Sequence, residues 1–112
     1  MNPKYEVIFL EEAMKFLESV DEKAREKILY NIDKSRYMND PKLFKKLTSE
    51  IWEFRTQYRK LQYRLLAFWD KRDKKETLVV STHGIVKKTS KVPGSEIKKA
   101  EQIRKEYFED EQ

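Results

Sequence analysis

The stretch IWEFRTQYRKLQYRLLAFW, residues 51–69, decides the fold. It holds two runs rich in β-branched and aromatic residues, 51–58 and 61–69, with only two residues between them. Runs of this composition favour strands, and so short a gap favours their antiparallel pairing as neighbours. The stretch therefore predicts a β-hairpin, and a third strand-like run at 77–83 extends it to an antiparallel meander.

The register of this hairpin brings two arginines together. If Arg59 and Lys60 form the turn, counting back from it places Arg55 directly across from Arg64 on one face. Like charges that face each other across strands cost stability, and an anion between them removes the conflict. Arg64 also has apolar neighbours in its strand, so we expect its side chain to be buried there, where its charge needs compensation. It could form an ion pair with Glu53, bind an anion, or extend to solvent at the sheet edge.

The segments before and after the meander differ in the spacing of their apolar residues. The run 5–10 predicts a strand, and helical spacing of apolar residues then predicts helices over 11–19 and 22–36, the second capped by Asp21. A short helical turn is expected through Leu43, Phe44 and Leu47, and a last helix with Pro93 in its first turn. The order β-α-α-β-β-β-α predicts one α+β domain over 1–112, with the meander packed against the helices.

Charge is distributed unevenly along the chain. The net charge is +5, but residues 34–91 hold 16 Lys and Arg against 6 Asp and Glu, while both flanking segments have more acidic than basic residues. Such a basic segment favours a polyanion as partner, although surface lysines also serve solubility alone.

Composition also excludes several kinds of chemistry. The chain has no cysteine and one histidine, so thiolate metal sites and disulfides are excluded, and neither of its two glycines forms a phosphate-binding loop. We therefore expect no metal and no cofactor. No apolar run is long enough to span a bilayer, and we expect a cytoplasmic protein that does not bind membranes.

The stretch HGIVKKTSKVP, residues 83–93, joins the last predicted strand to the last predicted helix. His83 is expected to end the strand, and Lys87, Lys88 and Lys91 to project from the segment that follows. His83 is either a hydrogen-bonded structural residue or a general base that works near neutral pH. The lysines are either solvated or phosphate contacts.

Taken in order, these motifs resemble one known family. IWEFR, then YR, then HGIVKKTSKVP, and then a helix with Glu96, Arg104 and Tyr107 resemble the RelE/ParE toxin superfamily, and more narrowly its HigB-like, phage-derived branch. The resemblance covers about residues 5–107. The sequence departs from that branch at Ile85, where the branch favours Phe, and at Val92, which replaces a Thr.

The resemblance implies a RelE-like fold and the toxin of a type II toxin–antitoxin pair. Such a toxin is a ribosome-dependent endoribonuclease that cuts mRNA in the A site without a metal, by attack of a ribose 2′-hydroxyl on the adjacent phosphate. Its implied partners are the ribosome, mRNA and a helix-turn-helix antitoxin, and we expect a monomer alone and a hetero-oligomer with the antitoxin. The alternatives are a ParE-like inhibitor of DNA gyrase and a basic RNA-binding domain without activity.

Residue roles follow from the same resemblance. Arg55, Arg64 and Lys87 would stabilise the charge that grows on the phosphate, and His83 or Tyr107 would move protons. Further contacts to RNA or the ribosome are expected from exposed cations, namely Lys88, Lys91, Arg59 and Lys60.

Overall fold

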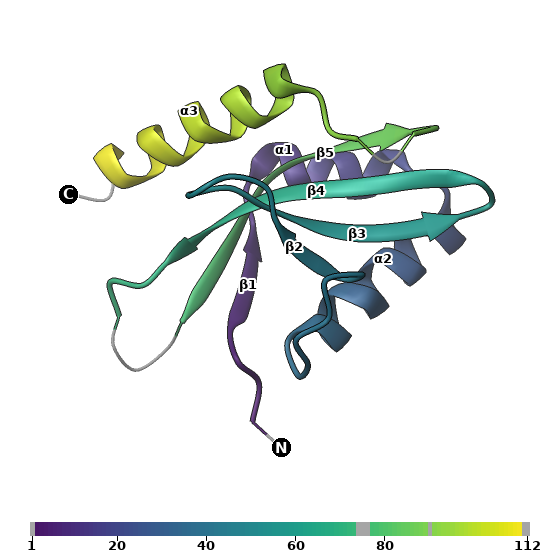
Figure 1. The fold of residues 1–112 in the computed structure, drawn as a ribbon, viewed down its shortest axis with the longest axis horizontal. Coiled ribbons are helices and arrows are strands. Elements are labelled where there is room, and N and C mark those ends of the chain that lie inside the picture. The colour runs from purple at the N-terminus through teal and green to yellow at the C-terminus, as the bar shows by residue number, and fades with distance from the viewer. Residues whose placement is uncertain (1, 74–76, 90, 111–112) are drawn as a thin grey trace.

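One mixed sheet organises the computed structural model, which describes residues 2–73, 77–89 and 91–110 (Figure 1). The strand order is β1-β5-β4-β3-β2, with β1 parallel to β5 and every other pair antiparallel. The strands are β1 (Glu6–Phe9), β2 (Phe44–Lys46), β3 (Trp52–Tyr58), β4 (Leu61–Asp70) and β5 (Leu78–Lys87).

Helices cover both faces of the sheet. Figure 1 shows α1 and α2 against one face and α3 against the other. The helices are α1 (Glu11–Ser19), α2 (Glu22–Ser35) and α3 (Gly94–Asp110). The first core joins Ala13, Leu17 and Ile28 of the helical pair to sheet residues such as Phe54 and Leu65. The second core lies under α3, and its buried members are Ile51, Leu66, Phe68, Val80, Val92 and Ala100. The α+β class is therefore confirmed.

The predicted register of the hairpin is confirmed to the residue, and its two strands differ from the predicted bounds by one residue each. β3 and β4 pair with Tyr58 opposite Leu61 and with Arg55 opposite Arg64. Arg59 and Lys60 form the two-residue turn, with φ of 51° and 68°. Positive φ at both positions is the conformation of the turn whose twist matches that of paired strands. The register thus follows from turn length, as expected.

The two N-terminal helices also begin and end close to the predicted bounds. The Asp21 carboxylate accepts hydrogen bonds from the backbone N–H groups of Lys23 and Ala24, at 3.1 and 3.3 Å. This is the cap expected from the sequence, and it separates α2 from α1.

Three details of the prediction are wrong. Residues 44–46 form the edge strand β2 instead of part of a helical turn, because Phe44 pairs with Phe54 and stacks on it at 4.4 Å between ring centroids. β5 continues four residues beyond the predicted end, so His83 lies inside the strand and Lys87 is its last residue. The last helix begins at Gly94, one residue after Pro93, whose carbonyl accepts from the N–H groups of Glu96 and Ile97.

The described ranges contain neither a membrane-spanning helix nor a cluster of metal-ligating side chains. No helix there is long and apolar enough to cross a membrane. No group of three or more His, Cys, Asp or Glu side chains is placed to hold a metal ion.

Candidate anion site

A basic pocket lies at the β3 side of the hairpin. Its volume is about 300 Å³. We call it the cation pocket; its lining residues are Lys27, Asn31, Lys42, Arg55, Thr56, Gln57, Gln62 and Arg64. Four of these side chains are cationic and three are amides, and no carboxylate is among the described residues that line it. An anion is the ligand that such a lining favours.

Three segments meet at this pocket. α2 supplies Lys27 and Asn31, and the Asn31 amide donates to the Thr56 hydroxyl at 3.1 Å, which fixes the helix to β3. The segment before β2 supplies Lys42. The pairing of β2 with β3 reaches only as far as Phe54, so β3 is an edge strand beyond that point. The open edge gives the pocket its access.

Arg55 is held at the rim of the pocket. Its backbone N–H donates to the Leu43 carbonyl at 2.8 Å, and its guanidinium donates to the Pro41 carbonyl at 3.3 Å. Its side chain keeps 25% of its surface exposed, so it is within reach of a ligand in solution.

Arg64 lies deeper, with only 1% of its side chain exposed. Its guanidinium donates to the Tyr63 carbonyl at 3.1 Å and to the Gln62 side-chain oxygen at 3.0 Å. Its Nε lies 3.3 Å from a carboxylate oxygen of Glu53. The ion pair with Glu53 that the sequence left open is therefore present.

Glu53 is shared by the two arginines. Its second oxygen lies 3.5 Å from the Nε of Arg55, and its side chain is 4% exposed. Burial raises the pKa of Glu53, against the opposite effect of Arg64 and Arg55. Burial also lowers the pKa of Arg64, and the charge of Arg55 adds to that effect while Glu53 opposes it. With all three groups ionised, this trio carries one net positive charge.

Hydrogen bonding in the trio is incomplete. The Nε atoms of Arg55 and Arg64 and the Oε1 of Glu53 are buried, and none of the three makes a hydrogen bond among the described residues, although the ion pairs join them at 3.3 and 3.5 Å. Buried polar atoms without hydrogen bonds cost stability, and a charged ligand that accepts from a guanidinium offsets that cost for the two donors. The net positive charge of the trio favours an anion as that ligand.

His83 connects β5 to α3. Its Nε2 lies 2.9 Å from a carboxylate oxygen of Glu96, and its Nδ1 lies 3.0 Å from the Thr82 hydroxyl. The carboxylate requires a proton on Nε2, so Nδ1 of the neutral ring accepts from Thr82. His83 is 3% exposed, and burial lowers its pKa despite the opposing effect of the hydrogen bond that it donates to Glu96. Both ring nitrogens are engaged, which is the arrangement of a structural histidine.

Tyr107 lies near the other end of the sheet. Its hydroxyl donates to Asp70 at 2.8 Å, and Asp70 has a pKa lowered to about 2, mainly by Arg72 and also by Tyr107. Asp70 is six residues beyond Arg64 on β4, which is about 20 Å along a strand. The structure does not bring Tyr107 together with the arginines.

The remaining predicted cations are spread over the surface. Lys87 ends β5 opposite Gln62 and donates from its amine to the Lys91 carbonyl. Lys88 and Lys91 are exposed between β5 and α3. Arg59 and Lys60 project from the hairpin turn beyond the cation pocket, and the Arg59 guanidinium lies 5.2 Å from the ring centre of Tyr58.

Sequence reasoning missed six members of the pocket: Lys27, Asn31, Lys42, Thr56, Gln57 and Gln62. The hairpin register contains the positions of the last three, since Thr56 follows Arg55 on β3 and Gln57 pairs with Gln62 two residues from the arginine pair. No comparable sign exists for the other three, because α2 and the segment before β2 reach β3 only through tertiary packing.

Comparisons with known proteins place the chain in context. The sequence profile of one family, described as "Phage derived protein Gp49-like (DUF891)", matches residues 15–105. A search of curated proteins finds no significant match. Among solved structures, the archaeal RelE–RelB complex from Pyrococcus horikoshii OT3 contains a similar chain. The two are 15% identical with a TM-score of 0.47, over 75% of this chain and 93% of that one.

Proposed function

Because the chain belongs to the phage-derived Gp49-like family, a RelE/HigB-type toxin family, we propose that it is a toxin that cleaves mRNA on the ribosome. The resemblance drawn from its motifs to the phage-derived branch of the toxin superfamily is confirmed by that membership. The ribosome-dependent cleavage itself is our proposal.

The observation that carries the proposal is the cation pocket. Four cations surround a space of about 300 Å³ that opens at a strand edge, and two of them are the arginines that face each other across the hairpin. A phosphodiester in this space would accept from both guanidiniums. Its charge grows during cleavage, and fixed donors in a water-poor site stabilise that growing charge most.

The proposed reaction takes place on the ribosome and uses no metal. The ribose 2′-hydroxyl gives up its proton to the ribosome-bound complex and its oxygen attacks the adjacent phosphorus. The bond from phosphorus to the 5′-oxygen breaks, and the 5′-oxygen takes a proton from the same complex. Arg64 is held in place by Gln62 and Glu53, so it is the fixed donor to the phosphoryl oxygens. Arg55 is more exposed and closes on the phosphate from the rim. Lys27 and Lys42 hold flanking phosphates.

We propose other roles for three of the predicted residues, on the basis of the contacts that they make. His83 holds α3 to β5, because both of its nitrogens already have partners and its ring is buried. Tyr107 stabilises the Asp70 carboxylate instead of reaching the phosphate. Lys87 sits two residues beyond the arginine row on β5 and contributes charge at the rim. We assign proton transfer to the ribosome-bound complex and to no side chain of this chain.

The partners belong to the same proposal. A toxin of this class acts in the cytoplasm and is kept inactive by an antitoxin, for which we propose a helix-turn-helix protein. The similar chain from Pyrococcus horikoshii was itself crystallised in a RelE–RelB complex. We propose that the chain is monomeric alone and forms a hetero-oligomer with the antitoxin.

Cleavage by purified protein tests the proposal. Defined mRNA is incubated with the protein alone, with the protein and EDTA, and with the protein and ribosomes. We expect cleavage only with ribosomes, and none with the Arg55→Ala variant. Cleavage of naked RNA that EDTA abolishes would contradict the mechanism. DNA damage that precedes translation arrest in cells would point to the gyrase alternative.

A further inference from the structure

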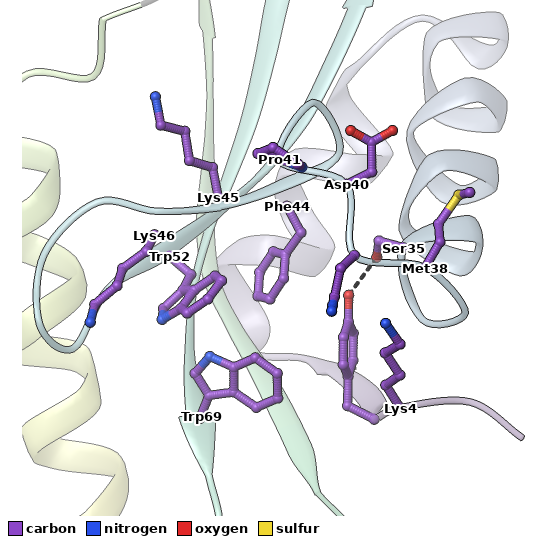
Figure 2. A pocket seen from close by; sticks show the side chains of 12 residues that line it. Lys4, Ser35, Met38, Asp40, Pro41, Phe44, Lys45, Lys46, Trp52 and Trp69 are labelled. Carbon is purple, nitrogen blue, oxygen red and sulfur yellow. Dashed lines mark hydrogen bonds between the residues drawn. The ribbon is translucent and has the colours of Figure 1, made fainter.

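A second pocket lies on the α2 side of the sheet, next to the segment before β2. Its volume is about 390 Å³, and four aromatic side chains line it: Tyr5, Phe44, Trp52 and Trp69. We call it the aromatic pocket. Figure 2 shows the rings of Phe44, Trp52 and Trp69 grouped around it, with the amines of Lys45 and Lys46 pointing away from the rings.

The rings are fixed by one another. Phe44 stacks on Trp52 at 4.9 Å between centroids, and Trp69 meets Trp52 edge-on at 5.5 Å. Tyr5 meets Trp69 edge-on at 5.2 Å, and its hydroxyl donates to Ser35 at 2.7 Å. Such mutual packing holds the pocket open in the free protein, so that little ordering is needed when a ligand enters.

Positive charge surrounds the aromatic lining. Lys4, Lys45 and Lys46 line the same pocket and are exposed, and the Lys71 amine lies 5.1 Å from the ring centre of Trp69. Asp40 is the carboxylate among the described lining residues, and it already accepts from the Lys42 N–H at 2.9 Å. Aromatic rings flanked by cations are the combination that binds single-stranded nucleic acid, because bases stack on the rings while cations hold phosphates.

The aromatic pocket and the cation pocket are lined by consecutive residues of the segment before β2. Pro41 lines the first and Lys42 the second, and the Pro41 carbonyl accepts from Arg55. Trp52 is three residues from Arg55 on β3, about 10 Å along the strand, and this odd spacing directs the two side chains to opposite faces of the sheet. A strand of RNA with one phosphate at Arg55 would therefore pass around the open edge of β3, beside Pro41, to bring a neighbouring nucleotide to the aromatic pocket.

We propose that the aromatic pocket binds a base of single-stranded RNA that flanks the phosphate held by Arg55 and Arg64. The inference deepens the proposed function and rests on it for the identity of the RNA as substrate. An acidic peptide with an apolar side chain is the competing occupant. RNA is favoured because the lining is aromatic and because the adjacent cation pocket supplies a second row of charges for phosphates.

The chain offers a direct probe of binding. It has two tryptophans, and both line the aromatic pocket as well as a neighbouring pocket with Lys71, Arg72 and Arg104. Tryptophan fluorescence therefore reports on a ligand that enters either space. The protein is titrated with a short single-stranded RNA, with an abasic strand of the same length, and with inorganic polyphosphate. We expect saturable quenching by the RNA, with a dissociation constant at least about fivefold lower than that of the abasic strand. We expect no quenching by polyphosphate.

A matched pair of double variants distinguishes RNA binding at this pocket from RNA binding to positive charge anywhere on the surface. Lys45→Ala with Lys46→Ala should raise the dissociation constant of the RNA severalfold. The control is Lys23→Ala with Lys98→Ala, which removes the same charge from exposed positions on α2 and α3 and should leave binding nearly unchanged. All four side chains are exposed, so the fold is expected to survive each change. Trp52→Phe and Trp69→Phe assign the signal to each ring.

The outcomes distinguish this inference from the proposed function. Arg55→Ala should lose cleavage yet keep the quenching, and a protein that never cleaves RNA can still show quenching by bases. Equal quenching by RNA, abasic strand and polyphosphate would overturn the inference, because the bases would then play no part. Quenching by an acidic peptide with a leucine anchor and not by RNA would also overturn it and would assign the pocket to a protein partner.

Discussion

Arg55 and Arg64 face each other in the hairpin, but their surroundings differ. Arg64 is 1% exposed and shares Glu53 with Arg55, which is 25% exposed. From sequence alone, relief of repulsion predicts that loss of either arginine leaves stability unchanged or higher. The structure alters that expectation for Arg64, because its removal leaves the buried Glu53 with one distant partner.

We therefore expect Arg64→Ala to lower the free energy of unfolding by about 3 kcal/mol, the scale for breaking a buried ion pair. Arg55→Ala should cost about 1 kcal/mol or less, because its ion pair is long and partly exposed. Both variants should lose cleavage. Thermal melts and denaturant titrations measure the difference, with a drop of roughly 10 °C in the first case.

A second substitution checks the cause. In the Arg64→Ala variant, Glu53→Gln removes a buried charge that has lost its nearer partner, and it should recover part of the lost free energy of unfolding. In the native chain, Glu53→Gln should raise the free energy of unfolding less. An additive pair of effects would mean that Glu53 does not depend on Arg64. Equal melting temperatures for the two arginine variants would contradict the assigned burial.

His83 predicts a pH dependence of stability. Burial lowers its pKa in the folded chain, although the Glu96 hydrogen bond opposes this, with smaller effects from Lys99 and Glu12. A histidine with a lowered folded pKa binds its proton more readily when unfolded. The stability it contributes is therefore complete above its unfolded pKa, about 6.5, and is lost as the pH falls toward the folded value.

His83→Gln should remove that part of the dependence. Denaturant titrations at pH 7.5 and 5.5 should show a smaller difference for the variant than for the native chain. The folded variant should also retain cleavage, since His83 is assigned a structural role. A folded variant without cleavage would restore the general-base role for this residue.

Among the helices and strands, features that depend on neighbouring residues were predicted, and pairings between distant segments of the chain were not. The α1–α2 break follows from Asp21, and the hairpin register follows from a two-residue turn, since both depend on neighbours in sequence. β2 was missed because three residues with two lysines become a strand only through pairing with β3. The β1–β5 pair was not predicted for the same reason, since parallel partners are separated by most of the chain.

The candidate site divides in the same way. Two arginines on adjacent strands could be placed from register alone. Lys42 and Lys27 could not, because their places depend on how α2 and the segment before β2 pack on β3.

The hairpin turn makes a further prediction at this scale. Arg59 and Lys60 both have positive φ, which costs a residue with a side chain roughly 1 kcal/mol relative to glycine. Lys60→Gly should therefore be more stable than Lys60→Ala by about that amount, although both lose the same charge. Thermal melts compare the two. Equal stability would mean that the turn is not strained, and equal loss of ribosome binding would show that the charge of Lys60 is used there.

At the scale of the molecule, cations gather along one side of the sheet. The cation pocket, the exposed lysines of β2 and the aromatic pocket follow the β3–β2 edge, whereas α1 opens with Glu11 and Glu12. A chain with net charge +5 would bind any polyanion weakly through scattered lysines. Binding that depends on the position of the lysines, and not on their number, would therefore identify this edge as an RNA surface.

The salt dependence of ribosome binding tests whether the lysines along the β3–β2 edge contact RNA. Affinity falls as salt rises, and each phosphate contact with single-stranded RNA makes the plot of log affinity against log salt concentration steeper by about 0.7. Lys27→Ala with Lys42→Ala should make that plot less steep by about 1.4. Lys88→Ala with Lys91→Ala should also make it less steep, because the family resemblance implies that the segment after β5 contacts RNA. Lys23→Ala with Lys98→Ala, equal in charge, should change it little. Because all six lysines are exposed, circular dichroism should be the same for every variant. Equal slopes for the three pairs would mean that net charge alone governs binding, and the assignment of the β3–β2 edge as the RNA surface would then fail.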